Sequence, residues 1–234
     1  MLYLLPDSTF FLILPAFFFA LWAQNRVGHV YKKYSKVHSR SGVTGAQVAR
    51  RLLDDANLQN VAVEMGRGNL SDHYDPRDGT IRLSPDVYQS SSLAALGIAA
   101  HETGHAIQHG DGYFPLNFRN NIFPVANIGS RMAFPLFFIG FIFAGAEGAG
   151  LGFLMDIGIL LFAFAVVFQL ITLPVEFNAS SRAVALLESS NYITREEVGP
   201  TRQVLNAAAL TYIAAVAVAL SQLIRLLILR NRRN

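Results

Sequence analysis

Residues 92–110 read SLAALGIAAHETGHAIQHG. Alanine, leucine and isoleucine favour a helix from Ser92 to His109, which Gly110 can end. Inside it, residues 101–105 form an H-E-x-x-H pattern. Positions i and i+4 share a helix face, so His101 and His105 can reach one zinc ion while Glu102 serves as general base. The stretch therefore predicts a helix that carries a metal site.

Gly104, inside the pattern, is a poor helix former that costs about 1 kcal/mol relative to alanine. A close approach of another backbone to the helix would explain it. The alternative for the whole pattern is two ordinary histidines with no ligand role, since a short motif can arise by accident.

A catalytic zinc ion needs three protein ligands and one open position. The chain has no cysteine, so the third ligand must be a histidine or a carboxylate. Glu176 is the predicted ligand, because it follows an apolar run and lies about 70 residues after His105. Asp156, inside that apolar run, is the rival and would indicate cleavage within the bilayer. The remaining histidines are weaker candidates: His29, His38, His73 and His109.

The composition is too apolar for a soluble domain, with 52% hydrophobic and 15% charged residues. The net charge of +3 could suggest nucleic acid binding. The basic residues, however, lie beside apolar stretches and form no continuous patch. A membrane explains this placement, and nucleic acid is not an expected partner.

The apolar runs divide the chain into predicted segments. Residues 1–23 are an N-terminal transmembrane anchor, 132–173 a transmembrane hairpin turning at Gly145–Gly152, and 207–234 a C-terminal transmembrane helix with a basic tail. Lys and Arg residues follow Ala23 closely, so we expect residues 24–131 to face the cytoplasm and the hairpin turn to lie outside. Four crossings place the tail outside, although its arginines favour the cytoplasm. Either the first helix sets the orientation of the whole chain, or the last helix is not a simple span.

Residues 24–131 are the predicted catalytic segment, which contains short periodic runs before the motif helix. The predicted fold is a mainly α integral membrane protein with a zincin-like α+β catalytic portion, in which a small β-hairpin or sheet precedes the H-E-x-x-H helix. The elements expected in it are an amphipathic helix at Gly45–Ala56, a strand at Val61–Met65, and a hairpin whose strands, Leu70–Tyr74 and Thr80–Leu83, flank the turn Asp75–Gly79. Ser84-Pro85 is expected to start a further helix.

Four stretches resemble the YugP-type membrane neutral zinc metallopeptidases of bacteria: His101–Gln108, Ser71–Arg77, Leu173–Ala183 and Val204–Tyr212. The chain is similar more distantly to the HtpX-like integral membrane proteases, whose third ligand is the Glu of an E-x-x-A-D pattern. Glu176 and Ala179 match that pattern, but Ser180 stands in place of the Asp that orients a ligand histidine. Ser180 could accept the imidazole N–H more weakly. The resemblance implies peptidase activity, one zinc ion and a location in the cell membrane.

The expected reaction is peptide-bond hydrolysis by a zinc-activated water, with Glu102 moving the proton. Residues 174–206 are predicted to hold the third ligand on a new helix that Pro174 starts. Expected substrates are unfolded or membrane-extracted polypeptides that add as a strand to the predicted sheet. A non-catalytic scaffold with a vestigial motif is the other alternative. Further residues that could orient ligands or contact substrate are Asn178, His73, Tyr74, His109 and Arg182.

Overall fold

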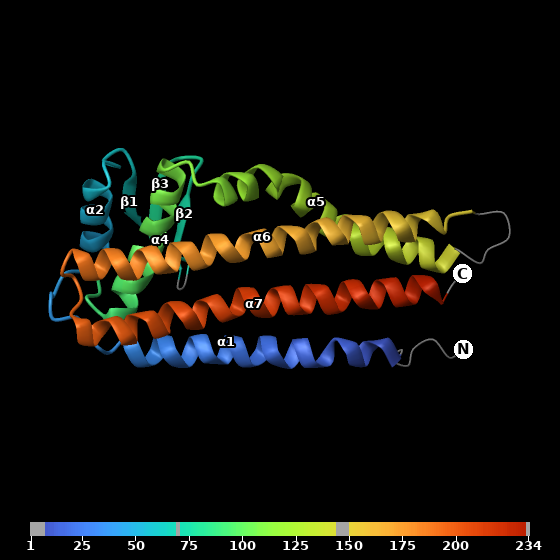
Figure 1. Ribbon diagram of the computed structural model, residues 1–234, viewed down its shortest axis with the longest axis horizontal. Helices are drawn as coiled ribbons and strands as arrows, with labels where there is room; N and C mark the ends of the chain where they lie inside the picture. Colours follow the sequence, from blue (N-terminus) through green and yellow to red (C-terminus); the bar gives the residue numbers. More distant parts are fainter. Residues whose placement is uncertain (1–7, 69–70, 144–149, 233–234) are drawn as a thin grey trace. The chain divides into compact units, whose positions relative to one another are not determined.

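The computed structural model of the chain describes residues 8–68, 71–143 and 150–232. The protein is mostly helical and contains one three-stranded sheet (Figure 1). Its elements in chain order are η1 (Ser8–Leu12), α1 (Leu14–Tyr34), α2 (Gly45–Asp55), β1 (Ala62–Met65), β2 (His73–Asp75), β3 (Thr80–Leu83), α3 (Pro85–Tyr88), α4 (Leu93–Gly110), α5 (Phe114–Phe143), α6 (Phe153–Ser189) and α7 (Arg195–Asn231).

Two compact units share these elements. The helical unit comprises Met1–Ala23, Phe118–Leu173 and Thr211–Asn234, and the mixed unit comprises Gln24–Asn117 and Pro174–Leu210. The mixed unit contains the sheet and the H-E-x-x-H helix, so the elements that can form a site are built from two separate stretches of chain.

The sheet of the mixed unit has the strand order β1-β3-β2. β2 and β3 form the predicted antiparallel hairpin, with Tyr74 opposite Ile81, and its loop closes through a hydrogen bond from Gly79 N to Asp75 O of 3.0 Å. Gly79 has a φ of 65°, which a glycine adopts without strain. β2 begins at His73 and is shorter than expected; Leu70 lies outside the described residues. β1 pairs with β3 in parallel, which leaves β2 as one edge of the sheet.

α4 is the central helix of the mixed unit. Ser92 caps its start, where the hydroxyl accepts a hydrogen bond from Ala95 N at 3.2 Å. One side of α4 packs on α2 and α6 through Leu96 and Leu187, and another packs towards the sheet through Ala99 and Ile81. Gly110 is the last helical residue, as expected, but the left-handed residue that follows the helix is Gly112, with a φ of 66°.

Within the described residues, three helices are long and apolar enough to cross a membrane, namely α5, α6 and α7. The predicted first span, Thr9–Ala23, is not among them, because its helix starts at Leu14 and continues through polar turns to Tyr34. The N-terminal anchor therefore stays a prediction. α5 begins at Phe114, well ahead of the expected hairpin start at 132, and most of the predicted turn, residues 145–149, lies outside the described residues.

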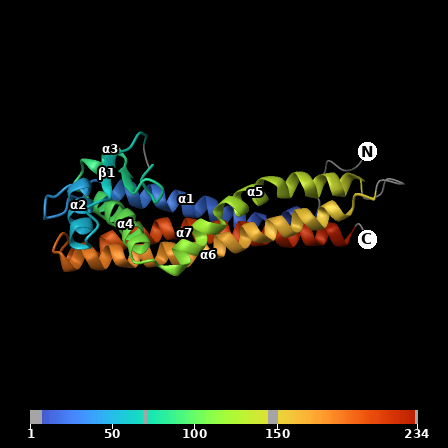
Figure 2. The same cartoon turned by 90° about the horizontal axis from the view of Figure 1, so that it is seen from above.

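Two glycines let α5 and α6 approach closely in the helical unit (Figure 2). A Cβ on Gly158 would lie 2.6 Å from Ala133 O, and a Cβ on Gly140 would lie 2.5 Å from Met155 N. Small residues at such contacts are typical of packed membrane helices, because van der Waals contact replaces the hydrophobic effect there.

The structure corrects the prediction that Pro174 starts a new helix. α6 runs from Phe153 to Ser189 without a break, and Pro174 lies inside it. An interior proline costs about 3 kcal/mol, but Val175 and Ala179 on the following turn are fully buried. Tertiary packing on this side outweighs the local preference. The third predicted ligand therefore sits on the same helix as an apolar, span-length segment.

The end of α7 lies beside the start of α6. Arg230 donates to Asp156 through Nε at 2.8 Å and Nη2 at 3.1 Å. Arg225 and Thr9 lie 3.4 Å apart in the same unit, which brings the N-terminal 3-10 helix to this end. If α6 and α7 both cross a membrane, the C-terminal tail and the start of α6 are on the same side.

Candidate metal centre

The structure brings His101, His105 and Glu176 together within the mixed unit. His101 Nε2 lies 3.3 Å and His105 Nε2 lies 3.5 Å from the same atom, Glu176 Oε2. The three possible ligand atoms lie within 4.8 Å of one another, which is close enough for one ion. Glu176 is 5% and His105 8% exposed, so the centre is largely shielded from solvent. Two adjacent helices, α4 and α6, thus supply a three-ligand set.

Both imidazoles are held by their other ring nitrogen. His101 Nδ1 lies 3.1 Å from Ser180 Oγ, and His105 Nδ1 lies 3.0 Å from Gln108 Oε1. These contacts turn each Nε2 towards Glu176. In metal sites, partners of this kind fix the ring orientation of the ligand histidine.

The charge around His105 favours a cation at the centre. Burial by itself lowers the pKa of His105, but the hydrogen bond with Glu176 and the charge of Glu102 raise it above its usual value. A proton and a metal ion compete for the same imidazole lone pair. Two carboxylates near two imidazoles are therefore suited to a divalent cation.

Gly104 is where α6 comes closest to the ligand helix. A Cβ at Gly104 would lie 2.9 Å from Ala179 O and 3.3 Å from Ala179 Cα. This agrees with the close backbone approach expected from the sequence. The contact sits one turn beyond Glu176, so it also sets how near Glu176 can come to the two histidines.

We expect Gly104→Ala to destabilise the protein and weaken metal binding. Alanine gains about 1 kcal/mol in helix propensity, but overpacking against backbone costs typically 1–3 kcal/mol. Gly28→Ala is the matched control, because Gly28 is an exposed position inside α1 and a Cβ there meets nothing within 4 Å. Thermal unfolding in detergent and zinc content measure both effects. A Gly104→Ala protein that is as stable as the Gly28→Ala protein and binds zinc normally would contradict the close contact.

Glu102 lies beside the ligands and is 9% exposed. Its Oε2 accepts a hydrogen bond of 3.0 Å from the backbone N of Tyr74, on the edge strand β2. Because Tyr74 N points to Glu102, the backbone N–H and C=O of Tyr74 face away from β3. The carboxylate is thereby fixed between the metal centre and the strand edge.

Comparison with known proteins shows the family of the chain. The profile of a family described as "Putative neutral zinc metallopeptidase" matches residues 9–231. The chain belongs to this zinc metallopeptidase family. A relative from Bacillus subtilis (strain 168), named "Putative membrane protease YugP", is 48% identical over 215 residues, which cover 92% of this chain and 93% of the relative. No solved structure matches the chain significantly.

Several other predicted site residues of this family member form a polar group next to the centre. Asn178 Oδ1 accepts hydrogen bonds of 2.9 Å from Gln108 Nε2 and from Arg182 Nε. Arg182 Nη1 also pairs with Asp111 Oδ2 at 2.6 Å. Arg182 and Asn178 therefore lie one layer behind the ligands. Sequence reasoning missed Gln108 as a functional residue; a buried amide one turn beyond His105 on an apolar helix was the available signal.

The remaining candidates have other partners. The hydroxyl of Tyr74 lies 2.8 Å from His109 Nδ1, and burial raises the pKa of Tyr74, with Asp75 and Asp78 adding to the effect. His73 is exposed and its Nδ1 lies 2.7 Å from Ser71 O. The rival ligand Asp156 is not in the cluster, because it belongs to the helical unit and pairs with Arg230.

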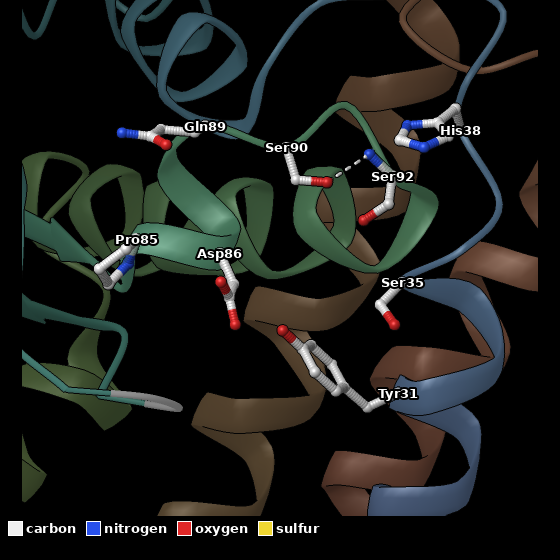
Figure 3. Close-up of a pocket in the computed structure, with 8 residues that line it drawn as sticks. All are labelled: Tyr31, Ser35, His38, Pro85, Asp86, Gln89, Ser90 and Ser92. Carbon is white, nitrogen blue, oxygen red and sulfur yellow. Dashed lines mark hydrogen bonds between the residues drawn. The ribbon is translucent and has the colours of Figure 1, made fainter.

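A separate hollow of about 490 Å³ lies at the start of α4, away from the H-E-x-x-H turn (Figure 3). Its lining includes Tyr31 from α1, Asp86 from α3 and the cap residue Ser92. Burial raises the pKa of Tyr31, and the charges of Asp86 and Asp72 add to this. None of the three candidate ligands lines it.

Proposed function

We propose that the protein is a membrane-anchored zinc endopeptidase with His101, His105 and Glu176 as ligands and Glu102 as general base. The convergence of two Nε2 atoms on one carboxylate oxygen carries the proposal. In a chain without cysteine, imidazoles and carboxylates are the strong zinc ligands, and three of them leave the fourth position open for water. The donor set therefore fits a catalytic zinc ion.

The chain's own residues supply the proton transfers. Zinc bound at this centre would lower the pKa of a water molecule to about 7 and polarise the peptide carbonyl. Glu102 accepts the water proton and later passes it to the departing amine. The hydrogen bond from Tyr74 N keeps one carboxylate oxygen in place during these steps. This division of roles agrees with a carboxylate that is buried beside the ligands but separate from them.

The edge strand β2 favours extended substrates. The outer edge of β2 at Tyr74 lies next to Glu102, which already accepts the Tyr74 N–H, so a substrate that adds as a further strand through the remaining groups of this edge would bring its backbone to the centre. A folded protein seldom offers a free extended segment. The proposed substrates are therefore unfolded or membrane-extracted polypeptides, and we place the enzyme in the cell membrane.

Metal analysis of the detergent-purified full chain tests the proposal. We expect about one zinc ion per chain, cleavage of an unfolded protein such as casein, loss of cleavage on chelation and recovery on adding zinc. Zinc binding without cleavage would instead support the non-catalytic scaffold, and a chain that binds no zinc would end the proposal.

We expect the mixed unit to face the cytoplasm and the C-terminal tail to lie outside. Residues 24–40 carry several Lys and Arg residues, which favours the cytoplasm for this segment, while the Arg230–Asp156 pair joins the tail to the opposite end of α6. The natural chain has no cysteine, so single cysteines at the exposed positions Asn60 and Asn231 report the two sides cleanly. An impermeant thiol reagent on intact cells should label Asn231→Cys and not Asn60→Cys. The reverse pattern would invert the topology.

A further inference from the structure

Gln108 is a fully buried amide whose three polar positions are all engaged. Its Nε2 donates to Val175 O and to Asn178 Oδ1, both at 2.9 Å, and its Oε1 lies 3.0 Å from His105 Nδ1. Its exposed fraction is 0%. Two of these partners lie on α6 and one on α4, so a single side chain ties the helix of two ligands to the helix of the third.

The directions of the hydrogen bonds in this group follow from two groups that each have one possible role: Val175 O can only accept, which makes Gln108 Nε2 the donor, and the Arg182 guanidinium can only donate. A guanidinium can only donate, so the Asn178 atom that contacts Arg182 Nε is the oxygen. That oxygen must then receive a donor from Gln108, and Val175 O receives the second. The remaining atom of the Gln108 amide is its oxygen, which can only accept. His105 Nδ1 must therefore carry the proton, and in the neutral ring the lone pair is left on Nε2.

The two candidate histidine ligands differ in how they are held. Ser180, next to His101 Nδ1, has a hydroxyl that can donate or accept, so it orients the ring without selecting a tautomer. Gln108 leaves His105 only one tautomer. Arg182 is itself fixed by its ion pair with Asp111 at 2.6 Å, so the series of hydrogen bonds that starts at His105 ends at this ion pair.

We propose that Gln108 is a positioning residue that holds His105 as the Nδ1–H tautomer, with Val175 O fixing the orientation of the Gln108 amide and Arg182 reinforcing it through Asn178. The inference rests on the proposed function in that it takes His105 as a zinc ligand. Its effect is on metal affinity: a ring free to adopt the other tautomer presents an N–H to the ion in place of a lone pair. Loss of such an outer partner typically costs 10–100-fold in metal affinity.

Zinc affinity of the full-length protein in detergent, measured by competition with a chromophoric chelator, tests the role of Gln108. Gln108→Leu removes all three contacts and should weaken zinc binding at least tenfold. Gln108→Glu keeps an acceptor for His105 Nδ1–H but loses the donors to Val175 O and Asn178 Oδ1, so it should bind zinc more weakly than the natural protein and more tightly than Gln108→Leu. Thr103→Val is the matched control, since Thr103 is also 0% exposed on α4 but its hydroxyl donates to Ala99 O within the same helix. It should leave zinc affinity within about twofold, as expected for a change that touches no ligand.

The absorption spectrum of the cobalt-substituted protein gives a second readout that does not depend on activity. Gln108→Leu should change the ligand-field bands, whereas Thr103→Val should not. Arg182→Met is a variant at a partly exposed position and should lower zinc affinity severalfold, because the Asn178 amide is then free to turn over.

Natural zinc affinity and an unchanged cobalt spectrum in Gln108→Leu would overturn the inference, as would a folded Gln108→Glu protein that binds no measurable zinc. If Gln108→Leu does not fold, the zinc affinities of Gln108→Glu and Arg182→Met test the inference. Unchanged zinc affinity in Arg182→Met would show that Arg182 has no part in it. A natural protein that binds no zinc would instead refute the proposed function and is recognised before any variant is compared.

Discussion

Glu176→Ala is expected to leave the protein without bound zinc and without peptidase activity. Glu176 Oε2 is the atom on which both imidazole Nε2 atoms converge, at 3.3 and 3.5 Å. Removing it leaves two ligands, and a catalytic zinc site needs three. It also removes one of the two carboxylates that face the imidazoles in this buried centre. Zinc content after dialysis and cleavage of unfolded casein measure the loss, which should be complete within detection.

Asp156→Asn is the matched control for this experiment and also tests intramembrane cleavage. Asp156 and Glu176 lie on one unbroken helix and are separated by 20 positions, which at 1.5 Å per residue is about 30 Å. Zinc–oxygen bonds are about 2.0 to 2.2 Å long, so one ion cannot use both carboxylates. Asp156→Asn should therefore keep its zinc and its activity. If Asp156→Asn emptied the site while Glu176→Ala kept its zinc, the metal would lie inside the apolar part of α6 and the proposed centre would be wrong.

Glu102→Gln is expected to keep zinc and lose nearly all proteolysis. The amide has the same shape, and its carbonyl oxygen can still accept the hydrogen bond from Tyr74 N, so the side chain should stay in place. It cannot accept the water proton, and loss of a general base typically costs 10²–10⁴-fold in rate. Turnover numbers at saturating casein, together with zinc content, separate the two effects.

The outcome of Glu102→Gln also distinguishes catalysis from scaffolding. A scaffold has no use for a base, so its binding of a polypeptide would be the same in both proteins. Turnover close to that of the natural protein in Glu102→Gln would show that another group moves the proton, and the proposed mechanism would fail.

The elements that could be predicted from sequence are those fixed by neighbours along the chain. The β2–β3 hairpin depends on the turn that ends at Gly79, and α2 depends on the capping box formed by Thr44 and Gln47. The helix that carries His101 and His105 follows from local composition together with the motif. Each of these signals lies within a few residues of the structure it predicts.

The features that could not be predicted depend on contacts between distant segments. Pro174 is a helix-start signal by its local sequence, and only the burial of Val175 and Ala179 makes α6 continuous through it. The parallel pairing of β1 with β3 has no local signal. Gln108 looked like one more polar residue at the end of a helix, because its partners Val175 and Asn178 are about 70 positions away. Glu176 was preferred to the histidines because it follows an apolar run, and the structure brings it next to His101 and His105.

The unbroken course of α6 has a consequence for when the protein can become active during its synthesis. The ribosome completes the helix with His101 and His105 about 70 residues before it reaches Glu176, and the whole α5–α6 hairpin lies between them. On the proposed ligand set, a nascent chain cannot retain catalytic zinc until this apolar hairpin has been made. Helices of this length and composition can span a bilayer, so the proposed peptidase would be assembled only with its membrane helices made, and no active precursor would precede them.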